Sequence, residues 1–374
     1  MQILKKTNLK GFEKAKELGQ QGVIELIKQK GLTGRGGARF PTGTKWEMVF
    51  NAPSPENNEK YVICNADEGE PGTFKDKFIL MNNPEAVIEG ILIASYAIGA
   101  KQAFIYLRGE YDYLEADLTK TIKQVLKKTK AETNIDIIVG AGAYICGDET
   151  AIISSIEGQR GQARSKPPFP TTHGLFGKPT IINNVETLTN VPLCMMFDDW
   201  DENLHLMSVS GDVKKPGVYE LPLGTNLCKL MEIVQPKNKI KAIYFGCFGG
   251  CMPHCDIELH PDNICGKDCM LGSCTIIAVD ETKSIVDLAT NIAKFYEFES
   301  CGKCTPCREG TMRVLGLLEN ISMGKGTMKD LDTLQELGEV IKETSFCGLG
   351  QTATHHLLTA LKYFRNEFEE KVKK

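Results

Sequence analysis

A chain of 374 residues with 42% hydrophobic and 25% charged residues has the composition of an ordinary globular protein, and its length predicts two or three domains. The formal net charge of −4 argues against a nucleic-acid-binding protein. No stretch approaches the roughly 18 uninterrupted apolar residues of a membrane span, and the first residues lack the apolar core of a secretion signal. We therefore expect a cytoplasmic protein without direct membrane insertion.

The first 200 residues carry the pattern of an α/β domain. Apolar residues recur at helical spacing from Gly11 to Lys30, and a glycine-rich loop, GLTGRGGARFPTGTKW, follows. Three short apolar runs beginning at Tyr61, Ala103 and Ile135 predict strands, with helical patterns between them. This alternation predicts a parallel sheet, which binds ligands at the carboxyl ends of its strands.

The predicted secondary structure changes twice in the rest of the chain. Short strand patterns with turn residues, and a helical segment from Asn226, predict a small α+β domain over residues 201–283. From Ser284 the periodicity is almost wholly helical, which predicts a helical bundle over residues 284–374.

Fourteen cysteines in a chain without a secretion signal indicate thiolate ligands for metal. Cys301, Cys304 and Cys307 form a C-x-x-C-x-x-C motif that can bind one iron–sulfur cubane, and Cys347 is the expected fourth ligand. Thr305 and Pro306 fit an N-cap and a first helical position, so Cys307 falls in the first turn of a helix. A zinc knuckle or unrelated core cysteines are the alternatives to a cluster.

Six further cysteines occupy one short stretch of the α+β domain. A zinc site or an additional iron–sulfur cluster would suit them, and the alternative is that several are buried small residues. These residues are Cys247, Cys251, Cys255, Cys265, Cys269 and Cys274.

Three loops are candidates for a cofactor site. In the glycine-rich loop, backbone amides around Gly34 and Gly36 could surround a phosphate that Lys45 neutralises, although the loop is not a Walker A motif and could equally be an unliganded surface loop. The second loop follows the Tyr61 strand, and its side chains could bind sugar hydroxyls or form a solvated acidic turn. Its polar residues are Asn65, Asp67, Glu68 and Glu70.

The third loop, residues 144–149, adds further carboxylates and an aromatic side chain. Tyr144 could stack on a flat ring or pack against the sheet. The loop ends in the two carboxylates of Asp148 and Glu149.

Six motifs in order give the chain a resemblance to a known family: GRGGARFPTGTKWE, CNADEGEPGTFKD, GAGAYICGDETA, KPPFP, INNVET and ESCGKCTPCREGT. The chain resembles the NADH-binding FMN and iron–sulfur flavoprotein subunit of respiratory complex I and its relatives in soluble hydrogenases, formate dehydrogenases, transhydrogenases and electron-bifurcating complexes. The resemblance implies a Rossmann-like FMN- and NAD(P)H-binding domain over residues 1–200. It also implies a ubiquitin-like β-grasp domain over residues 201–283, in which the cysteine-rich segment is an insertion, and a helical [4Fe–4S] domain over residues 284–374.

The resemblance also assigns site residues. It implies an FMN site formed by Gly34, Gly36, Lys45, Asn65, Asp67, Gly147, Asp148, Asn183 and Asn184, with Glu68 of the acidic loop nearby. It implies a dinucleotide site formed by Phe40, Glu70, Tyr144, Glu149, Lys166 and Phe169. The cluster ligands would be Cys301, Cys304, Cys307 and Cys347, and no catalytic side chain is expected because hydride transfer needs none.

Three residues depart from the family pattern, namely Arg39, Met48 and Asp148. Glu149 next to the adenosine ribose would favour NADH, because its carboxylate would repel a 2′-phosphate. Arg39 could attract that phosphate, so the sequence leaves NADPH open. The six-cysteine segment is absent from the respiratory relatives, so the resemblance implies nothing about its role.

The implied function is that of a diaphorase subunit. Hydride passes between nicotinamide and FMN, and single electrons leave through the [4Fe–4S] cluster to partner subunits. The expected partners are a thioredoxin-like [2Fe–2S] subunit and a larger iron–sulfur, hydrogenase, formate dehydrogenase or flavin subunit. Electron bifurcation with ferredoxin is a competing enzyme function, and an iron–sulfur or zinc scaffold that has lost FMN is the non-catalytic alternative.

Overall fold

The computed structural model describes residues 1–53 and 59–372, and the chain divides into two compact units. The first unit comprises Met1–Gly69 and Phe74–His205, and the second comprises Glu70–Thr73 and Leu206–Lys374. Within the described ranges, no helix combines the length and apolar character needed to cross a membrane.

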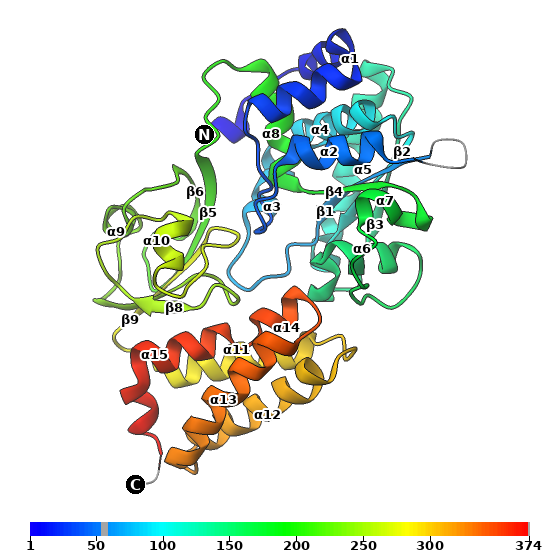
Figure 1. Ribbon diagram of the computed structural model, residues 1–374. Helices are drawn as coiled ribbons and strands as arrows, with labels where there is room; N and C mark the ends of the chain where they lie inside the picture. The colour runs from blue at the N-terminus through cyan, green and yellow to red at the C-terminus, as the bar shows by residue number, and fades with distance from the viewer. Residues whose placement is uncertain (54–58, 373–374) are drawn as a thin grey trace. The chain divides into compact units, whose positions relative to one another are not determined.

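A four-stranded parallel sheet is the centre of the first unit (Figure 1). Its order is β3-β2-β1-β4, and Cys64 of β1 lies opposite Ile105 of β2 and Asn183 of β4. Three strands confirm the predictions from the apolar runs, whereas β4 was not predicted as a strand. The strands are β1 (Tyr61–Ala66), β2 (Gln102–Leu107), β3 (Asn134–Val139) and β4 (Thr180–Asn184).

Helices α1, α4 and α8 pack against one another in the first unit. At Gly90 an added Cβ would lie 2.0 Å from the backbone oxygen of Leu188, so only glycine allows α4 and α8 to pack this tightly here. The α-helices are α1 (Lys10–Gln29), α2 (Thr42–Asn51), α3 (Lys75–Asn82), α4 (Pro84–Ile98), α5 (Glu115–Thr129), α6 (Glu149–Ile156), α7 (Pro170–His173) and α8 (Val185–Met196). The 3₁₀ turns are η1 (Gln2–Leu4), η2 (Gly109–Leu114), η3 (Tyr144–Gly147) and η4 (Leu175–Gly177).

The second unit begins with a mixed five-stranded sheet of order β6-β5-β9-β7-β8. Strands β5 and β9 are parallel, whereas β7 is antiparallel to both β8 and β9. This α+β arrangement agrees with the predicted β-grasp fold. The elements are β5 (Leu204–Gly211), β6 (Gly217–Pro222), α9 (Leu227–Val234), β7 (Ile240–Tyr244), β8 (Cys251–Pro253), α10 (Pro261–Cys265) and β9 (Thr275–Asp280).

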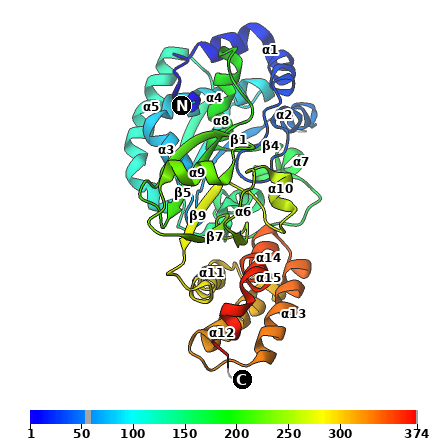
Figure 2. The same cartoon turned by 90° about the vertical axis from the view of Figure 1, so that its left-hand side faces the viewer.

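The predicted C-terminal helical bundle follows (Figure 2). Its buried core is continuous with that of the sheet. Ala242 of β7 and Val279 of β9 belong to the same buried cluster as Val286, Leu318 and Leu357 of the helices. The sheet and the bundle therefore form one compact unit, and the boundary expected at residues 283–284 remains a prediction. The helices are α11 (Ile285–Glu299), α12 (Thr305–Ser322), α13 (Met328–Thr344), α14 (Gly348–Thr352) and α15 (His355–Glu369).

Candidate flavin and iron–sulfur sites

The carboxyl ends of the first sheet bring two of the predicted loops into contact. The Nδ2 of Asn65, near the end of β1, donates a hydrogen bond to the backbone oxygen of Gly147 at 2.9 Å. The backbone N–H of Asp67 donates to the Oδ1 of Asn65 at 3.0 Å. The acidic loop and the residue 144–149 loop therefore meet at the edge of the sheet where parallel sheets bind ligands.

The glycine-rich loop is attached to the same edge. The backbone N–H of Arg35 donates to the Oγ1 of Thr187 on α8 at 2.8 Å. An added Cβ on Gly36 would lie 3.3 Å from the Cβ of Asn184. Glycine thus leaves exposed backbone beside the Asn183–Asn184 pair, an arrangement that fits a phosphate-bearing cofactor such as FMN.

Lys45 and Trp46 project from α2 toward the same region. The Nζ of Lys45 donates to the backbone oxygen of Ile182 at 3.3 Å, so the cation expected for a phosphate is held beside β4. The buried Trp46 donates its Nε1–H to the Oδ1 of Asn183 at 2.9 Å. The predicted FMN residue Asn183 is therefore fixed by a side chain that the sequence analysis did not select.

Two predicted FMN residues use their side chains as helix caps. The Oδ1 of Asp148 accepts hydrogen bonds from the backbone N–H groups of Thr150 and Ala151 on α6, at 2.9 and 3.1 Å. The Oδ1 of Asn184 accepts from the backbone N–H of Glu186 on α8 at 2.9 Å. Each cap satisfies helix N–H groups and fixes the direction in which its helix leaves the site.

Glu149 is held between two lysines. Lys166 donates a short hydrogen bond to its Oε1, and the Nζ of Lys45 lies 3.6 Å from its Oε2. Burial acts to raise the pKa of Glu149, but the two ammonium groups outweigh that effect and hold the pKa below its ordinary value. Glu149 is therefore a carboxylate at neutral pH.

The predicted aromatic residues lie on these loops with exposed rings. Phe40 and Phe169 are 41% and 53% exposed, which suits rings that stack on a ligand, and the Nζ of Lys45 lies 5.9 Å from the centre of the Phe40 ring. Tyr144 is half-buried and packs on the acidic loop, since an added Cβ on Gly69 would lie 2.9 Å from its Cδ2.

Two acidic-loop residues are more buried than the sequence suggests. Glu68 accepts hydrogen bonds from the backbone N–H groups of Asp76 and Lys77, at 2.8 and 3.0 Å. Glu70 lies in the second unit, where it accepts from the hydroxyl of Ser273 at 2.6 Å and the backbone N–H of Cys247 at 3.0 Å. The alternative of a solvated acidic turn is therefore wrong for both, and their cofactor contacts remain predictions.

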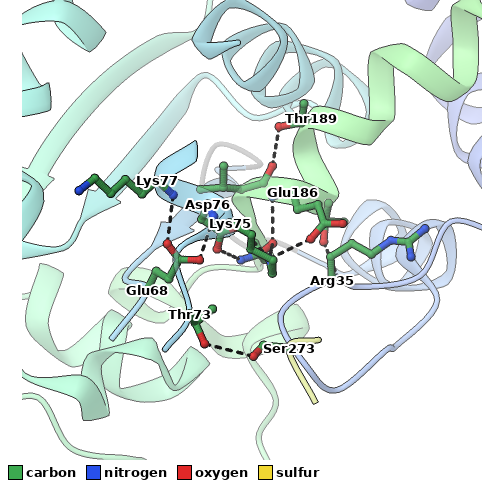
Figure 3. Close-up of polar contacts among 12 residues, drawn as sticks. Arg35, Glu68, Thr73, Lys75, Asp76, Lys77, Glu186, Thr189 and Ser273 are labelled. Atoms are coloured by element: carbon green, nitrogen blue, oxygen red, sulfur yellow. Dashed lines mark hydrogen bonds and ion pairs between the residues drawn. The ribbon is translucent and has the colours of Figure 1, made fainter. Parts of the chain in front are cut away.

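Three charged residues near the site were missed by sequence reasoning. Lys75, Asp76 and Glu186 are buried, and the Nζ of Lys75 lies 2.7 Å from Asp76 and 2.9 Å from Glu186 (Figure 3). The motifs that contain them, TFKD and NNVET, were recognised only as parts of a resemblance. Single charged residues in polar segments give no signal of burial, because most such residues lie on the surface.

The four predicted cluster ligands gather at one end of the helical bundle. Burial, together with the sulfurs of Cys304, Cys347 and Cys301, raises the pKa of Cys307 to about 11, while a hydrogen bond with Ser300 opposes the shift. The other three predicted ligands therefore lie within electrostatic reach of the Cys307 sulfur. The two ligand-bearing segments also meet directly, because the Nζ of Lys303 lies 4.5 Å from the centre of the Phe346 ring.

The donor chemistry of these four residues, all cysteine thiols, fits a [4Fe–4S] cluster. An added Cβ on Gly350 would lie 2.7 Å from the Oγ of Ser345 and 3.2 Å from the Cβ of Cys307, so the turn after Cys347 approaches the buried ligand through glycine. The helix begins one residue earlier than predicted: Cys304 is the N-cap of α12, with Thr305 and Pro306 in its first turn. Cys307 lies in that turn as expected.

The metal site considered for the cysteine-rich segment, zinc or iron–sulfur, stays a prediction. No three His, Cys, Asp or Glu side chains in the described parts of the chain are arranged to hold a single metal ion. Cys251 and Cys269 are buried, and burial raises the pKa of each to about 12. Cys247 and Cys274 are also buried, so four of the six cysteines have the surroundings of small core residues. An additional cluster in this segment stays a prediction.

A parallel sheet with these loops at its carboxyl end, and a helical bundle with four gathered thiols, define a flavin- and iron–sulfur-binding oxidoreductase subunit. A family model described as the Nuo51 FMN-binding domain matches residues 27–193. A second, described as the NADH-ubiquinone oxidoreductase-F iron–sulfur binding region, matches residues 287–371.

Known proteins agree with these matches. The F-type subunit of NADH-quinone oxidoreductase from Streptomyces coelicolor is 40% identical, with 97% of this chain and 85% of the relative covered. Its counterpart from Aquifex aeolicus is 42% identical, with 100% and 91% covered. The crystal structure of an NAD+-reducing [NiFe]-hydrogenase in the H2-reduced state has a TM-score of 0.88 at 36% identity, and the match covers 95% of this chain but 63% of the hydrogenase chain.

The chain belongs to the family of F-type NADH-quinone oxidoreductase subunits. The family confirms the expected resemblance, the fold class, the FMN-binding domain and the [4Fe–4S] region, and it confirms the assignment to FMN- and iron–sulfur-containing NADH dehydrogenase subunits.

Proposed function

We propose that this chain is the NADH-oxidising subunit of a multi-subunit cytoplasmic oxidoreductase, and that it passes electrons from NADH to partner subunits. The observation that carries the proposal is the convergence of the glycine-rich loop, the acidic loop, the 144–149 loop and the Asn183–Asn184 pair at the carboxyl end of one parallel sheet. Bound FMN supplies the conversion between a two-electron hydride and single electrons.

The first unit would hold FMN mainly through backbone groups and one cation. The side chains of Asp148 and Asn184 are used as helix caps, so their contribution is to fix the loops. Lys45 would neutralise the phosphate, while Gly34 and Gly36 leave their N–H groups accessible. Asn65, Asp67, Gly147 and Asn183 complete the proposed FMN set.

NADH would bind against the exposed aromatic rings of Phe40 and Phe169, with Tyr144 and Lys166 beside it. The ionised Glu149 would accept a hydrogen bond from the 2′-hydroxyl of the adenosine ribose and repel a 2′-phosphate. We therefore propose NADH as the preferred substrate, with Arg39 as the residue that would have to act if NADPH were preferred.

Electrons would leave through the [4Fe–4S] cluster bound by Cys301, Cys304, Cys307 and Cys347. A cluster that passes single electrons needs an acceptor, so a thioredoxin-like [2Fe–2S] subunit and a larger iron–sulfur, hydrogenase, formate dehydrogenase or flavin subunit are the proposed partners. Bifurcation with ferredoxin is a finer alternative that uses the same two cofactors, since flavin potentials depend on their surroundings.

The test is an anaerobic titration of the purified full chain after reconstitution with FMN, iron and sulfide. We expect one FMN and about four irons per chain, and bleaching of the flavin absorbance by NADH at far lower concentration than by NADPH. A chain that binds iron but no FMN would support the scaffold alternative and refute the proposal. Bifurcation would be supported if the assembled complex reduced ferredoxin with NADH only while a second, higher-potential acceptor was also reduced.

A further inference from the structure

Lys75, Asp76 and Glu186 form a buried ionic cluster (Figure 3). Lys75 opens α3 and is only 2% exposed. Its Nζ lies 2.7 Å from the Oδ1 of Asp76, 2.9 Å from the Oε2 of Glu186 and 3.4 Å from the Oδ1 of Asn184. One ammonium group thus binds two carboxylates from different helices and the cap residue of α8.

Glu68 adds a third carboxylate to this cluster. It accepts hydrogen bonds from the backbone N–H groups of Asp76 and Lys77 and from the hydroxyl of Tyr111 at 3.2 Å. Burial and the charge of Asp76 raise its pKa to about 8, although Lys75 acts in the opposite direction. Three carboxyl groups and one ammonium therefore share a buried volume. Burial also raises the pKa of Asp76, so with Glu68 protonated the cluster carries a net negative charge as long as Asp76 and Glu186 are ionised.

Burying such a cluster costs free energy of folding compared with packing apolar residues. Buried ion pairs often stabilise a fold less than apolar residues of similar volume, because each charge loses its hydration. Buried groups with strongly shifted pKa values are instead typical of functional sites.

Asn184 connects the cluster to the site. Its Nδ2 donates a short hydrogen bond to the Oδ2 of Asp76, and its Oδ1 accepts from Lys75 and from the backbone N–H of Glu186. The Cβ of the same residue faces Gly36 of the glycine-rich loop. The cluster therefore contacts directly a residue proposed to fix the loops of the FMN site.

We infer that Lys75, Asp76 and Glu186 are positioning residues of the flavin site, which fix Asn184 and whose net negative charge lowers the reduction potential of bound FMN. The inference rests on FMN binding by the first unit. Negative charge near a flavin disfavours the addition of electrons, and inside a protein the effect is stronger than in water because the local dielectric is low. The proposed direction suits a subunit that must give up electrons readily after taking them from NADH.

The test compares two substitutions of opposite charge effect in the reconstituted full chain. Glu186→Gln removes one negative charge with little change of shape, and Lys75→Met removes the positive charge. We expect the ratio of FMN dissociation constants, oxidised over reduced, to rise at least about tenfold in Glu186→Gln and to fall in Lys75→Met. A tenfold change corresponds to about 30 mV for a two-electron couple. The exposed Glu132→Gln in the same unit is the matched control and should leave the potential unchanged.

A purely structural role predicts a different pattern. It would lower FMN affinity in both variants without opposite shifts of potential, and that result would overturn the inference. If Lys75→Met does not fold, the double variant Lys75→Met/Asp76→Asn removes a buried pair while keeping the net charge. Its potential should then stay near that of the unsubstituted chain, and a shift as large as that of Glu186→Gln would contradict the charge argument. Absence of FMN from the unsubstituted chain refutes the proposed function, whereas bound FMN with unshifted potentials refutes only the role of the cluster.

Discussion

Replacing Glu70 by glutamine converts one buried acid of the second unit into a neutral side chain of the same shape. Burial raises the pKa of Glu70 from 4.5 to about 7, although the hydroxyls of Ser273 and Thr73 and the backbone N–H of Cys247 oppose the shift. The folded chain therefore holds this proton more tightly than the unfolded chain. For an acid with a raised folded-state pKa, the free energy of unfolding falls as the pH rises from 4.5 to 7.

The size of the effect follows from the shift. Each pKa unit corresponds to about 1.4 kcal/mol, so ionisation of Glu70 costs about 3 kcal/mol above pH 7. Glutamine avoids this cost and can keep the hydrogen bonds, because its Oε1 can accept from Cys247 while its amide donates to the two hydroxyls, which can act as acceptors. At about 2–4 °C per kcal/mol for a unit of this size, Glu70→Gln should melt about 6–12 °C higher than the unsubstituted chain at pH 8.

The assay is thermal unfolding of the reconstituted chain at pH 5 and pH 8, at one scan rate. The quantity compared is the difference between variant and unsubstituted chain at each pH, so that the titration of all other groups cancels. We expect a small difference at pH 5 and a large gain at pH 8. The exposed Glu281→Gln in the same unit is the control and should show no pH-dependent difference. Equal differences at both pH values, or a less stable variant at pH 8, would refute the reasoning.

Three further predictions concern the cofactor sites. Cys347→Ser should reduce the iron content from about four per chain to near zero and leave FMN in place, as measured by iron and flavin analysis, whereas the exposed Cys265→Ser should retain the iron. Glu149→Gln should lower the ratio of kcat/KM for NADH to kcat/KM for NADPH by about tenfold, or about 1.4 kcal/mol, because the charge that repels a 2′-phosphate is lost. An unchanged ratio would contradict this role. Trp46→Phe leaves the buried Oδ1 of Asn183 without its hydrogen-bond donor and should lower the free energy of unfolding by about 1–3 kcal/mol. The measured signs are a lower melting temperature and weaker FMN binding. Full retention of both would show that water replaces the indole N–H.

The sequence predicted elements best where periodicity was long or strongly apolar. The three strands at Tyr61, Ala103 and Ile135 and the helix after Gly11 lie where the pattern placed them. Strand β4 was not predicted because its short apolar run ends in two asparagines, a residue type that is typical of turns.

The limits at the sites have two physical causes. Lys75 and Glu186 could not be recognised as buried, because the partners that make burial of a charge tolerable come from distant parts of the chain. Cysteine is ambiguous for the opposite reason: it is both a metal ligand and a small apolar residue, so Cys251 and Cys269 could not be told from ligands by spacing alone.

The packing of the four residues Glu70–Thr73 has a consequence for the order in which the chain folds during synthesis. They stand in the middle of the first unit's sequence but pack with the second, where Thr73 donates to Glu70 and contacts Thr275. Residues 206–280 are synthesised well after this segment, so Glu70–Thr73 cannot form their packing contacts until most of the chain has been made. If FMN binding requires the finished loop, flavin loading would be a late event in biogenesis, and a truncated product that ends near His205 would lack the residues against which Glu70–Thr73 pack.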